Sequence, residues 1–294
     1  MPRAATAIIM ITMTTTLTES GLYRLLAWLS PSFPVGAFSY SHGIEAAVEA
    51  GRVGDRASLE AWVAAILRHG AGRIDADLLR DAWRVVAATK DCTADRASFE
   101  TPAIPAPQDE AILHGISDIP HPEERPMAAS RRTHDDRPSL GELMAIATRA
   151  DAHRGTAETA LEARAQGEAF LATCRAAWPH PLLDAWARAL AEEKRAPSYA
   201  VAIGVAAACA GVPLAASLTA YLHGVAANLV SAGLRLIPLG QTDGQRALQA
   251  LAPVVAACVA AALARPDADF GGCALAAELA SIDHETQYTR LFRS

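Results

Sequence analysis

The sequence predicts an all-α fold, a single-domain bundle of about ten helices with a long proline-rich insertion. Three observations lead to this prediction. Alanine is abundant and aromatic residues make up only 5% of the 294 residues, a composition that suits closely packed helices better than a β-sandwich. Apolar residues recur with helical spacing along most of the chain, and no segment shows the alternation that is typical of a strand.

The N-terminal part contains the signals of four helices. The first is predicted from Thr18 to Leu29, because its leucines recur at i, i+3, i+4 and i+7 before Ser30 and Pro31 end it. The other three are predicted from about Phe38 to Ala50, from a cap at Ser58 to His69, and from Asp75 to Thr89. In the C-terminal half, helices are predicted at about 139–150, 155–177, 181–194, 198–210, 213–236, 244–264 and 273–284.

Two stretches lack this periodicity. Prolines and scattered charges fill the chain from Lys90 to Pro138, which predicts a flexible insertion at about 90–138 rather than a part of the core. Residues 1–17 carry a short apolar run that threonines interrupt, without a clear cleavage site. This pattern predicts a disordered leader, or a start codon placed too early, with Met10 and Met13 as the alternative starts. Residues 18–294 are therefore expected to form one domain.

Charge and cysteine content narrow the class of protein. The net charge of −6 and the absence of a large basic cluster argue against nucleic-acid binding. The five cysteines form no CxxC pair and lie mostly among alanines, which favours a reducing cytoplasmic location over a disulfide framework. The uncharged span between Arg195 and Arg235 is long enough to cross a bilayer. Its alanines, glycines and polar residues favour two buried helices of a soluble bundle over a membrane span.

The densest polar segment is "SPSFPVGAFSYSHGIE", residues 30–45. One interpretation is a hydrolase of unknown substrate that uses Ser39, His42 and Glu45, because a nucleophile needs a base in contact with it and an orienting acid. Adjacent helical residues point about 100° apart, so Ser41 and His42 cannot pair, whereas Ser39 and His42 could. However, the chain has no GxSxG turn and no predicted strand to hold such a nucleophile. A recognition surface is therefore the preferred interpretation.

No cofactor or metal site is predicted. The chain has no P-loop and no HExxH or similar histidine pair. His284 lies between Asp283 and Glu285, which favours a solvated polar helix end over a metal site.

Two further segments have the composition of interaction surfaces. Asn228 and Arg235 lie two turns apart on an apolar helix, so they are expected to be paired or to lie at an interface. A polar loop at 240–244 follows, in which Asp243 is expected to cap the next helix. At the C-terminus, apolar and basic residues alternate in "QYTRLFRS", which predicts docking on this chain or on a partner.

Three separated segments together resemble the UreF family of urease accessory proteins: "LSPSFPVGAFSYSHGIE" (29–45), "NLVSAGLRLIPLGQTDGQR" (228–246) and "HETQYTRLFRS" (284–294). The resemblance implies an all-helical, non-enzymatic maturation factor that forms a homodimer. It also implies an adaptor that binds UreD (UreH in some bacteria), recruits and regulates the GTPase UreG, and acts on apo-urease during nickel insertion. The insertion at about 90–138 departs from the family pattern.

The position of each motif suggests which partner it contacts. Contact with UreD/UreH is expected at Phe33, Phe38, Tyr40, Tyr288, Arg290, Leu291, Phe292 and Arg293. Contact with UreG is expected at His42, Glu45, Gln241, Asp243, Gln245 and Arg246. No catalytic residue, cofactor or resident metal is expected.

Overall fold

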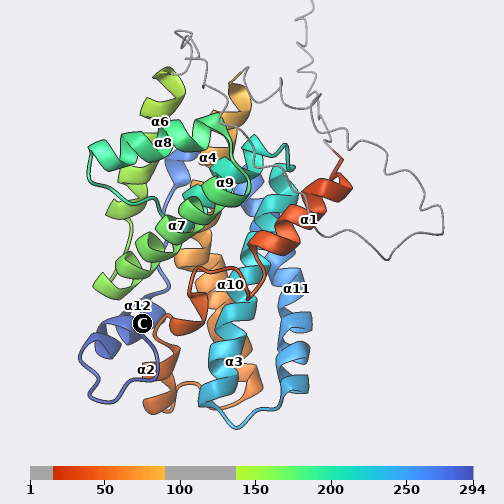
Figure 1. The fold of residues 1–294 in the computed structure, drawn as a ribbon. Helices are drawn as coiled ribbons and strands as arrows, with labels where there is room; N and C mark the ends of the chain where they lie inside the picture. The colour runs from red at the N-terminus through yellow and green to blue at the C-terminus, as the bar shows by residue number, and fades with distance from the viewer. Residues whose placement is uncertain (1–15, 90–136, 294) are drawn as a thin grey trace, which may run out of the picture.

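The structure is a computed structural model that describes residues 16–89 and 137–293 (Figure 1). Within these ranges every regular element is helical, which confirms the all-α prediction. The α-helices are α1 (Glu19–Trp28), α2 (Ile44–Glu49), α3 (Arg56–His69), α4 (Ala71–Ala88), α6 (Arg137–Ala152), α7 (Ala157–Ala177), α8 (Pro181–Glu192), α9 (Tyr199–Cys209), α10 (Leu214–Leu236), α11 (Gln241–Ala264) and α12 (Leu275–Glu285). Two 3₁₀ turns, η1 (Ala37–Ser39) and η3 (Asp267–Asp269), complete them. The predicted leader and insertion lie almost entirely outside the described residues.

Helix α9 forms the centre of the bundle. Every residue from Ala200 to Ala208 is buried, so this helix is apolar on all sides and is enclosed by other helices. Gly204 allows α9 to approach α4 closely, because a Cβ atom at this position would lie 2.5 Å from the carbonyl oxygen of Leu79. Helices α7 and α10 also pack on α9, and α3 and α11 pack against each other and against α10.

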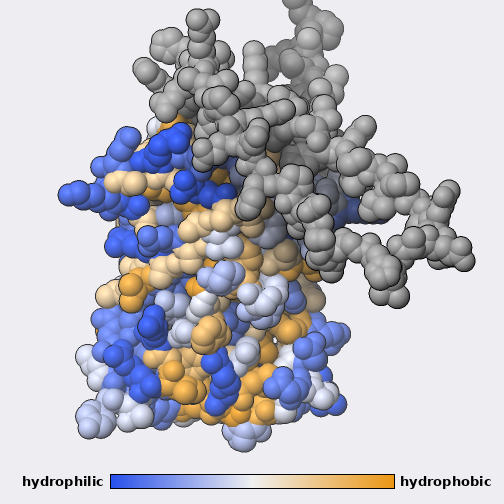
Figure 2. Space-filling view, in the orientation of Figure 1, coloured by the Kyte–Doolittle hydropathy of each residue, from blue (hydrophilic) through white to orange (hydrophobic). Residues whose placement is uncertain are grey.

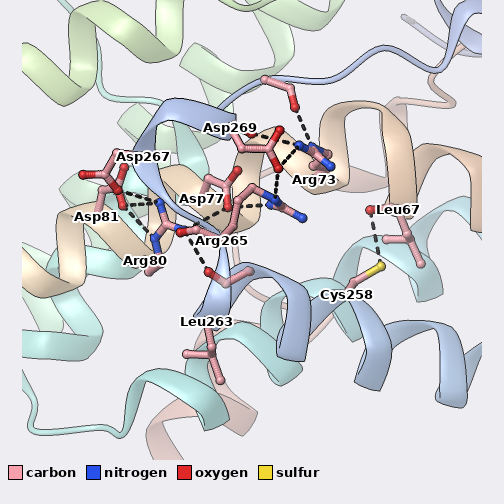
Figure 3. A network of polar contacts seen from close by, with 12 residues as sticks. Leu67, Arg73, Asp77, Arg80, Asp81, Cys258, Leu263, Arg265, Asp267 and Asp269 are labelled. Atoms are coloured by element: carbon pink, nitrogen blue, oxygen red, sulfur yellow. Dashed lines mark hydrogen bonds and ion pairs between the residues drawn. The ribbon is translucent and has the colours of Figure 1, made fainter. Parts of the chain in front are cut away.

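An ion-pair network joins α4 to the C-terminal end of α11 (Figure 3). Arg265 lies 2.7 Å from the buried carboxylate of Asp77, and the Arg80 guanidinium donates to the backbone oxygen of Ala262 over 2.8 Å. Burial raises the pKa of Asp77 even though both arginines oppose the change. Removing one partner from this buried network would leave a charge uncompensated. The network therefore fixes the position at which the chain leaves α11 and continues toward α12.

Two predicted helix starts are displaced by glycine or by left-handed backbone. The helix predicted from Phe38 begins only at Ile44, because His42 and Gly43 take left-handed conformations with φ of 51° and 74°. The helix predicted from Asp75 begins at Ala71, directly after Gly70 separates it from α3.

The starts of two other helices, α3 and α11, differ from the prediction because of their capping residues. Asp55, rather than Ser58, caps α3: the Ser58 N–H donates to the Asp55 carboxylate over 2.8 Å, and the Ser58 hydroxyl accepts the Asp55 N–H. Helix α11 begins at Gln241 rather than at 244, so the predicted polar loop is largely its first turn. Asp243 supports this start from inside the helix, since its carboxylate accepts the N–H of Gly240.

Helices α10 and α11 are long and apolar enough to cross a membrane, judged by length and composition alone. Buried helices of soluble proteins meet the same criterion. Both helices pack on α3 and on each other, and α11 leaves a side rich in alanine exposed.

A pair of glycine substitutions tests the packing of the central helix. Gly204→Ala should lower the free energy of unfolding by about 1–3 kcal/mol, because the added methyl group meets the α4 backbone. The matched change Gly141→Ala, on the exposed side of α6 with no atom within 4 Å, should instead raise it by about 0.5–1 kcal/mol. Chemical denaturation measures both. A harmless Gly204→Ala would contradict the close approach of α9 and α4.

Candidate partner-binding site

Two polar residues of α10, Asn228 and Arg235, hold the N-terminal segment at η1. The side-chain amide of Asn228 donates to the backbone oxygen of Ala37 over 2.8 Å, and the Arg235 guanidinium donates to that of Phe38 over 2.7 Å. The expectation that Asn228 and Arg235 are paired is therefore confirmed. Both acceptors lie in η1, so these contacts hold in place a short 3₁₀ turn that is not part of a longer helix.

The C-terminal segment lies on the same turn. The backbone N–H of Arg293 donates to the Ser39 carbonyl over 2.7 Å. The Phe292 ring is 4% exposed and lies under the Arg235 guanidinium, with its centroid 4.2 Å from the guanidinium carbon. η1, the C-terminal segment and α10 thus meet at one place.

Glu45, the first-turn carboxylate of α2, connects these parts. One of its oxygens accepts the N–H of Leu291 over 2.7 Å, and the other accepts that of Phe292 over 2.9 Å. The second oxygen also lies 3.1 Å from Nε2 of His284 in α12. A buried carboxylate needs such partners, so Glu45 determines where the C-terminal segment docks.

Glu158, in the first turn of α7, forms the other half of this arrangement. It lies 2.8 Å from Nδ1 of His284 and accepts from the Arg290 guanidinium over 2.8 Å. His284 is fully buried between the two carboxylates. This overturns the expectation of a solvated helix end, because the flanking Asp283 and Glu285 face outward while His284 faces inward.

Close packing of α2 on α12 positions the carboxylate of Glu45. A Cβ atom at Gly43 would lie 2.6 Å from the backbone nitrogen of Ser281, so only glycine fits between the two helices. The left-handed φ of Gly43 also starts α2 in the direction that buries Glu45. Glycine in "SHGIE" is thus required by both conformation and space.

His42 belongs to a second buried group, beside a cavity of about 280 Å³. Its Nε2 atom lies 2.9 Å from the carboxylate of Glu162 in α7. Burial alone would lower the pKa of His42, but the charge and hydrogen bond of Glu162, together with the charge of Asp75, outweigh burial and raise this pKa. Nearby, Asp75 accepts from Arg154 over 2.6 Å and from the Tyr221 hydroxyl over 2.8 Å.

These contacts do not assemble the hydrolase alternative. The carboxylate that orients His42 comes from Glu162, whereas Glu45 is engaged with His284 and the C-terminal segment. The Ser39 carbonyl holds Arg293. Ser39, His42 and Glu45 therefore contact different parts of the molecule instead of forming a relay. Among the residues that the structure describes, no group of three or more His, Cys, Asp or Glu side chains is arranged to hold a metal ion.

The residues predicted from the sequence divide into a buried frame and an exposed rim. Those buried are Phe33, Tyr40, Glu45 and Phe292, and His42 is half-buried. Those exposed are Phe38, Gln241, Gln245, Arg246, Tyr288, Arg290, Leu291 and Arg293, while Asp243 is half-buried and pairs with Arg246. Phe38 and Leu291 are 66% and 63% exposed, so large apolar groups face solvent here. Figure 2 shows apolar side chains gathered among charged ones in the lower half of this view, where α2, α12 and one end of α10 lie.

Sequence reasoning did not identify Glu158 and Glu162 as members of the site. Both lie on α7, four residues apart and therefore on one helical face, and both are buried. The sequence does contain a signal for them, because two carboxylates lie on one face of a helix that is otherwise rich in alanine.

Known proteins resemble this chain over most of its length. Residues 53–252 match the model of the UreF family. The chain is 44% identical to the urease accessory protein UreF of Rhodopseudomonas palustris strain BisB18, over 94% of this chain and 92% of the relative. It is 41% identical to that of Granulibacter bethesdensis, over 94% and 95% of the two chains. It is 40% identical to that of Magnetococcus marinus, over 94% and 99%.

Neighbouring residues in the C-terminal segment give a direct test of its docking. Phe292→Ala removes the buried ring, so it should cost about 3–5 kcal/mol and release residues 286–293. Leu291→Ala removes a side chain of similar size that faces solvent, and should change stability by no more than about 0.5 kcal/mol. Carboxypeptidase digestion of the two variants reads out the difference. Equal resistance in both would contradict the docked position.

Proposed function

Because the chain belongs to the UreF family of urease accessory proteins, we propose that it acts as a non-catalytic adaptor in urease maturation. It binds UreD (UreH), recruits UreG and regulates its GTPase cycle while nickel is inserted into apo-urease. The chain is an accessory protein rather than an enzyme. Nickel is the cargo of this assembly, and no residue is assigned as its resident ligand.

The observation that carries this proposal is the convergence of the family motifs. Three hydrogen bonds to backbone carbonyls of η1 tie it to α10 and to the C-terminal segment; the donors are the side chains of Asn228 and Arg235 and the backbone N–H of Arg293. The buried Glu45 accepts the backbone N–H groups of Leu291 and Phe292, and the exposed members of these segments include Phe38, Leu291 and Arg293. A rigid frame with an exposed apolar and basic rim is suited to binding another protein.

We assign UreD/UreH to the rim formed by Phe38, Tyr288, Arg290, Leu291 and Arg293. Exposed aromatic side chains and arginines are typical of protein interfaces, and Tyr288 is fully exposed. Phe292 holds this rim from inside through its contacts with Arg235 and Glu45, whereas Phe33 and Tyr40 are buried. The Phe33 ring is tilted against that of Phe170, with 5.3 Å between the ring centroids, and it stacks on Trp178.

We assign UreG to the first turn of α11. Gln241, Gln245 and Arg246 are exposed there, and Arg246 pairs with Asp243 over 3.1 Å. Figure 1 shows this turn at the same end of the bundle as α2, the terminus of the chain and the docked segment. His42 and Glu45 contribute by holding the neighbouring segments in place rather than by contact.

A second copy of the chain is assigned to the groove between α10 and α11. Apolar and small residues line it, including Ala252, Ala256 and Ala260, and no charged residue occurs between Arg246 and Arg265. Small side chains allow helices to pack closely, and an uncharged strip along a 24-residue helix suits a self-complementary contact.

The cellular location follows from the same proposal. We place the assembly in the cytoplasm, without binding to nucleic acid or insertion into a membrane. Within the described ranges, none of Cys174, Cys209, Cys258 and Cys273 forms a disulfide, which suits a reducing compartment.

Charge reversal tests the assignment of UreG. Arg246→Glu should weaken recruitment of UreG about tenfold, because it reverses the charge of an exposed side chain at the assigned UreG surface. Binding of UreD should be unchanged, since UreD is assigned to a different surface. Arg175→Glu is the matched control, since Arg175 has a comparable exposed carboxylate partner, Asp184, on the α7–α8 side. Co-purification with tagged UreD and UreG measures both. Undiminished UreG recovery by Arg246→Glu would overturn this assignment.

A second pair of variants tests the dimer. Ala256→Glu places a charge in the groove and should raise the dissociation constant of the dimer about a hundredfold, because an unpaired charge would be buried. Ala257→Glu, which lies outside the groove on an exposed side of the same helix, should leave the dimer intact. Sedimentation velocity distinguishes the two. A dimer that persists in Ala256→Glu would place the interface elsewhere.

A further inference from the structure

The cavity of about 280 Å³ beside His42 lies between the N-terminal segment, α7 and α10. Its outer part is lined by the exposed residues Phe38 and Ser231, and its inner part by the buried residues Asp75 and Gln166. The cavity therefore opens to solvent between η1 and α10 and extends into the bundle. An apolar protein cavity of about 150 Å³ already accepts a molecule the size of benzene, so this cavity has room for a ring and a head group.

Apolar side chains form a large part of the cavity wall. Leu29 and Phe33 line it from the N-terminal segment, and Val225 and Leu229 line it from α10. Gly224 of α10 leaves space between these groups, because a Cβ atom at this position would find its nearest neighbour, Cδ2 of Leu29, at 4.0 Å. Such a wall suits the apolar body of a small ligand.

The charged side chains at the inner end of the cavity pair with one another. Arg154 lies 2.6 Å from Asp75, and His42 lies 2.9 Å from Glu162. Although burial opposes it, Glu162 raises the pKa of His42, so each pair contains one cation and one anion. Glu278 lines a separate cavity of about 20 Å³ and is partly exposed to solvent, which screens its charge. A charged head group would therefore be buried without a counter-ion of its own, which favours a neutral ligand.

Two amide oxygens in the cavity lining have no hydrogen-bond donor among the described residues. Nε2 of Gln166 donates to Glu162 over 2.7 Å, which directs the Gln166 amide oxygen away from that carboxylate. Gln166 is only 5% exposed, so bulk water does not replace the missing donor. The side-chain nitrogen of Asn228 likewise donates to the Ala37 carbonyl, and its amide oxygen accepts from no described residue. Buried acceptors are normally satisfied, so the head group of a ligand here should be a donor.

We propose that this cavity binds a small neutral organic molecule, whose apolar body lies between the N-terminal segment and α10 and whose hydroxyl or N–H head group donates to Gln166. Because η1 forms part of the wall, the bound molecule would also contact the turn that Asn228 holds. This site belongs to the chain alone and does not depend on the identity of any protein partner.

Titration of the ¹⁵N-labelled full-length chain with four small aromatic probes, followed by NMR, tests the chemistry of the site. The isomers p-cresol and anisole differ in that only p-cresol carries an O–H donor. We expect p-cresol to bind with a dissociation constant on the order of 1 mM, and anisole about fivefold more weakly. Benzylammonium and benzoate are of similar size but charged, and should bind about tenfold more weakly than p-cresol. Binding of anisole or of either ion as tight as that of p-cresol would overturn the proposal.

Gly224→Leu tests the location of the site. Its side chain would occupy the cavity from α10, and leucine favours a helix more than glycine does, so this variant should fold. Binding of p-cresol should fall about tenfold. Gly141→Leu is the matched control, because a Cβ atom there would meet no atom of the described residues within 4 Å, and it should bind p-cresol like the unmodified chain. Undiminished binding by Gly224→Leu, or no binding of p-cresol by the unmodified chain, would overturn the proposal.

Discussion

The end of the bundle that contains α2, α12 and the C-terminal segment depends on the hydrogen bonds of the buried Glu45 carboxylate. Burying an ionised carboxylate is costly unless hydrogen bonds replace the water that it loses. Glu45 obtains those bonds from residues 239 to 247 positions further along the chain: His284 and the backbone of Leu291 and Phe292. One desolvated group therefore brings α2, α12 and the C-terminal segment together, and the glycine before α2 allows the approach.

This arrangement explains how a chain without a catalytic set among its described residues can carry so many polar residues. The polar side chains that looked like catalytic parts are used to hold segments in place: His42 pairs with Glu162, and Asn228 and Arg235 hold the η1 carbonyls. What remains exposed is a rim of aromatic, aliphatic and basic groups on a fixed backbone. Preorganisation of this kind lowers the entropic cost of binding a partner, which suits an adaptor better than an enzyme.

Much of the fold could be predicted from the sequence, because helical periodicity and alanine content report directly on helix packing. The long helices α7 to α11 were predicted to within a few residues. Starts were missed where local chemistry decides them, as at Asp55, or where left-handed backbone at His42 and Gly43 postpones a helix. The motifs identified residues of the site, but they did not indicate which of these residues are buried. Pairing of Glu45 with His284 spans most of the chain, and no local pattern reveals it.

The central claim is that the three family motifs form one composite surface for the maturation partners. Hydrogen exchange of the chain alone and in complex with UreD and UreG tests this most directly. The account predicts increased protection at residues 37–40, 241–246 and 286–293 together, with α8 unchanged. Protection confined to α8 or α6, with these three stretches unaffected, would contradict it.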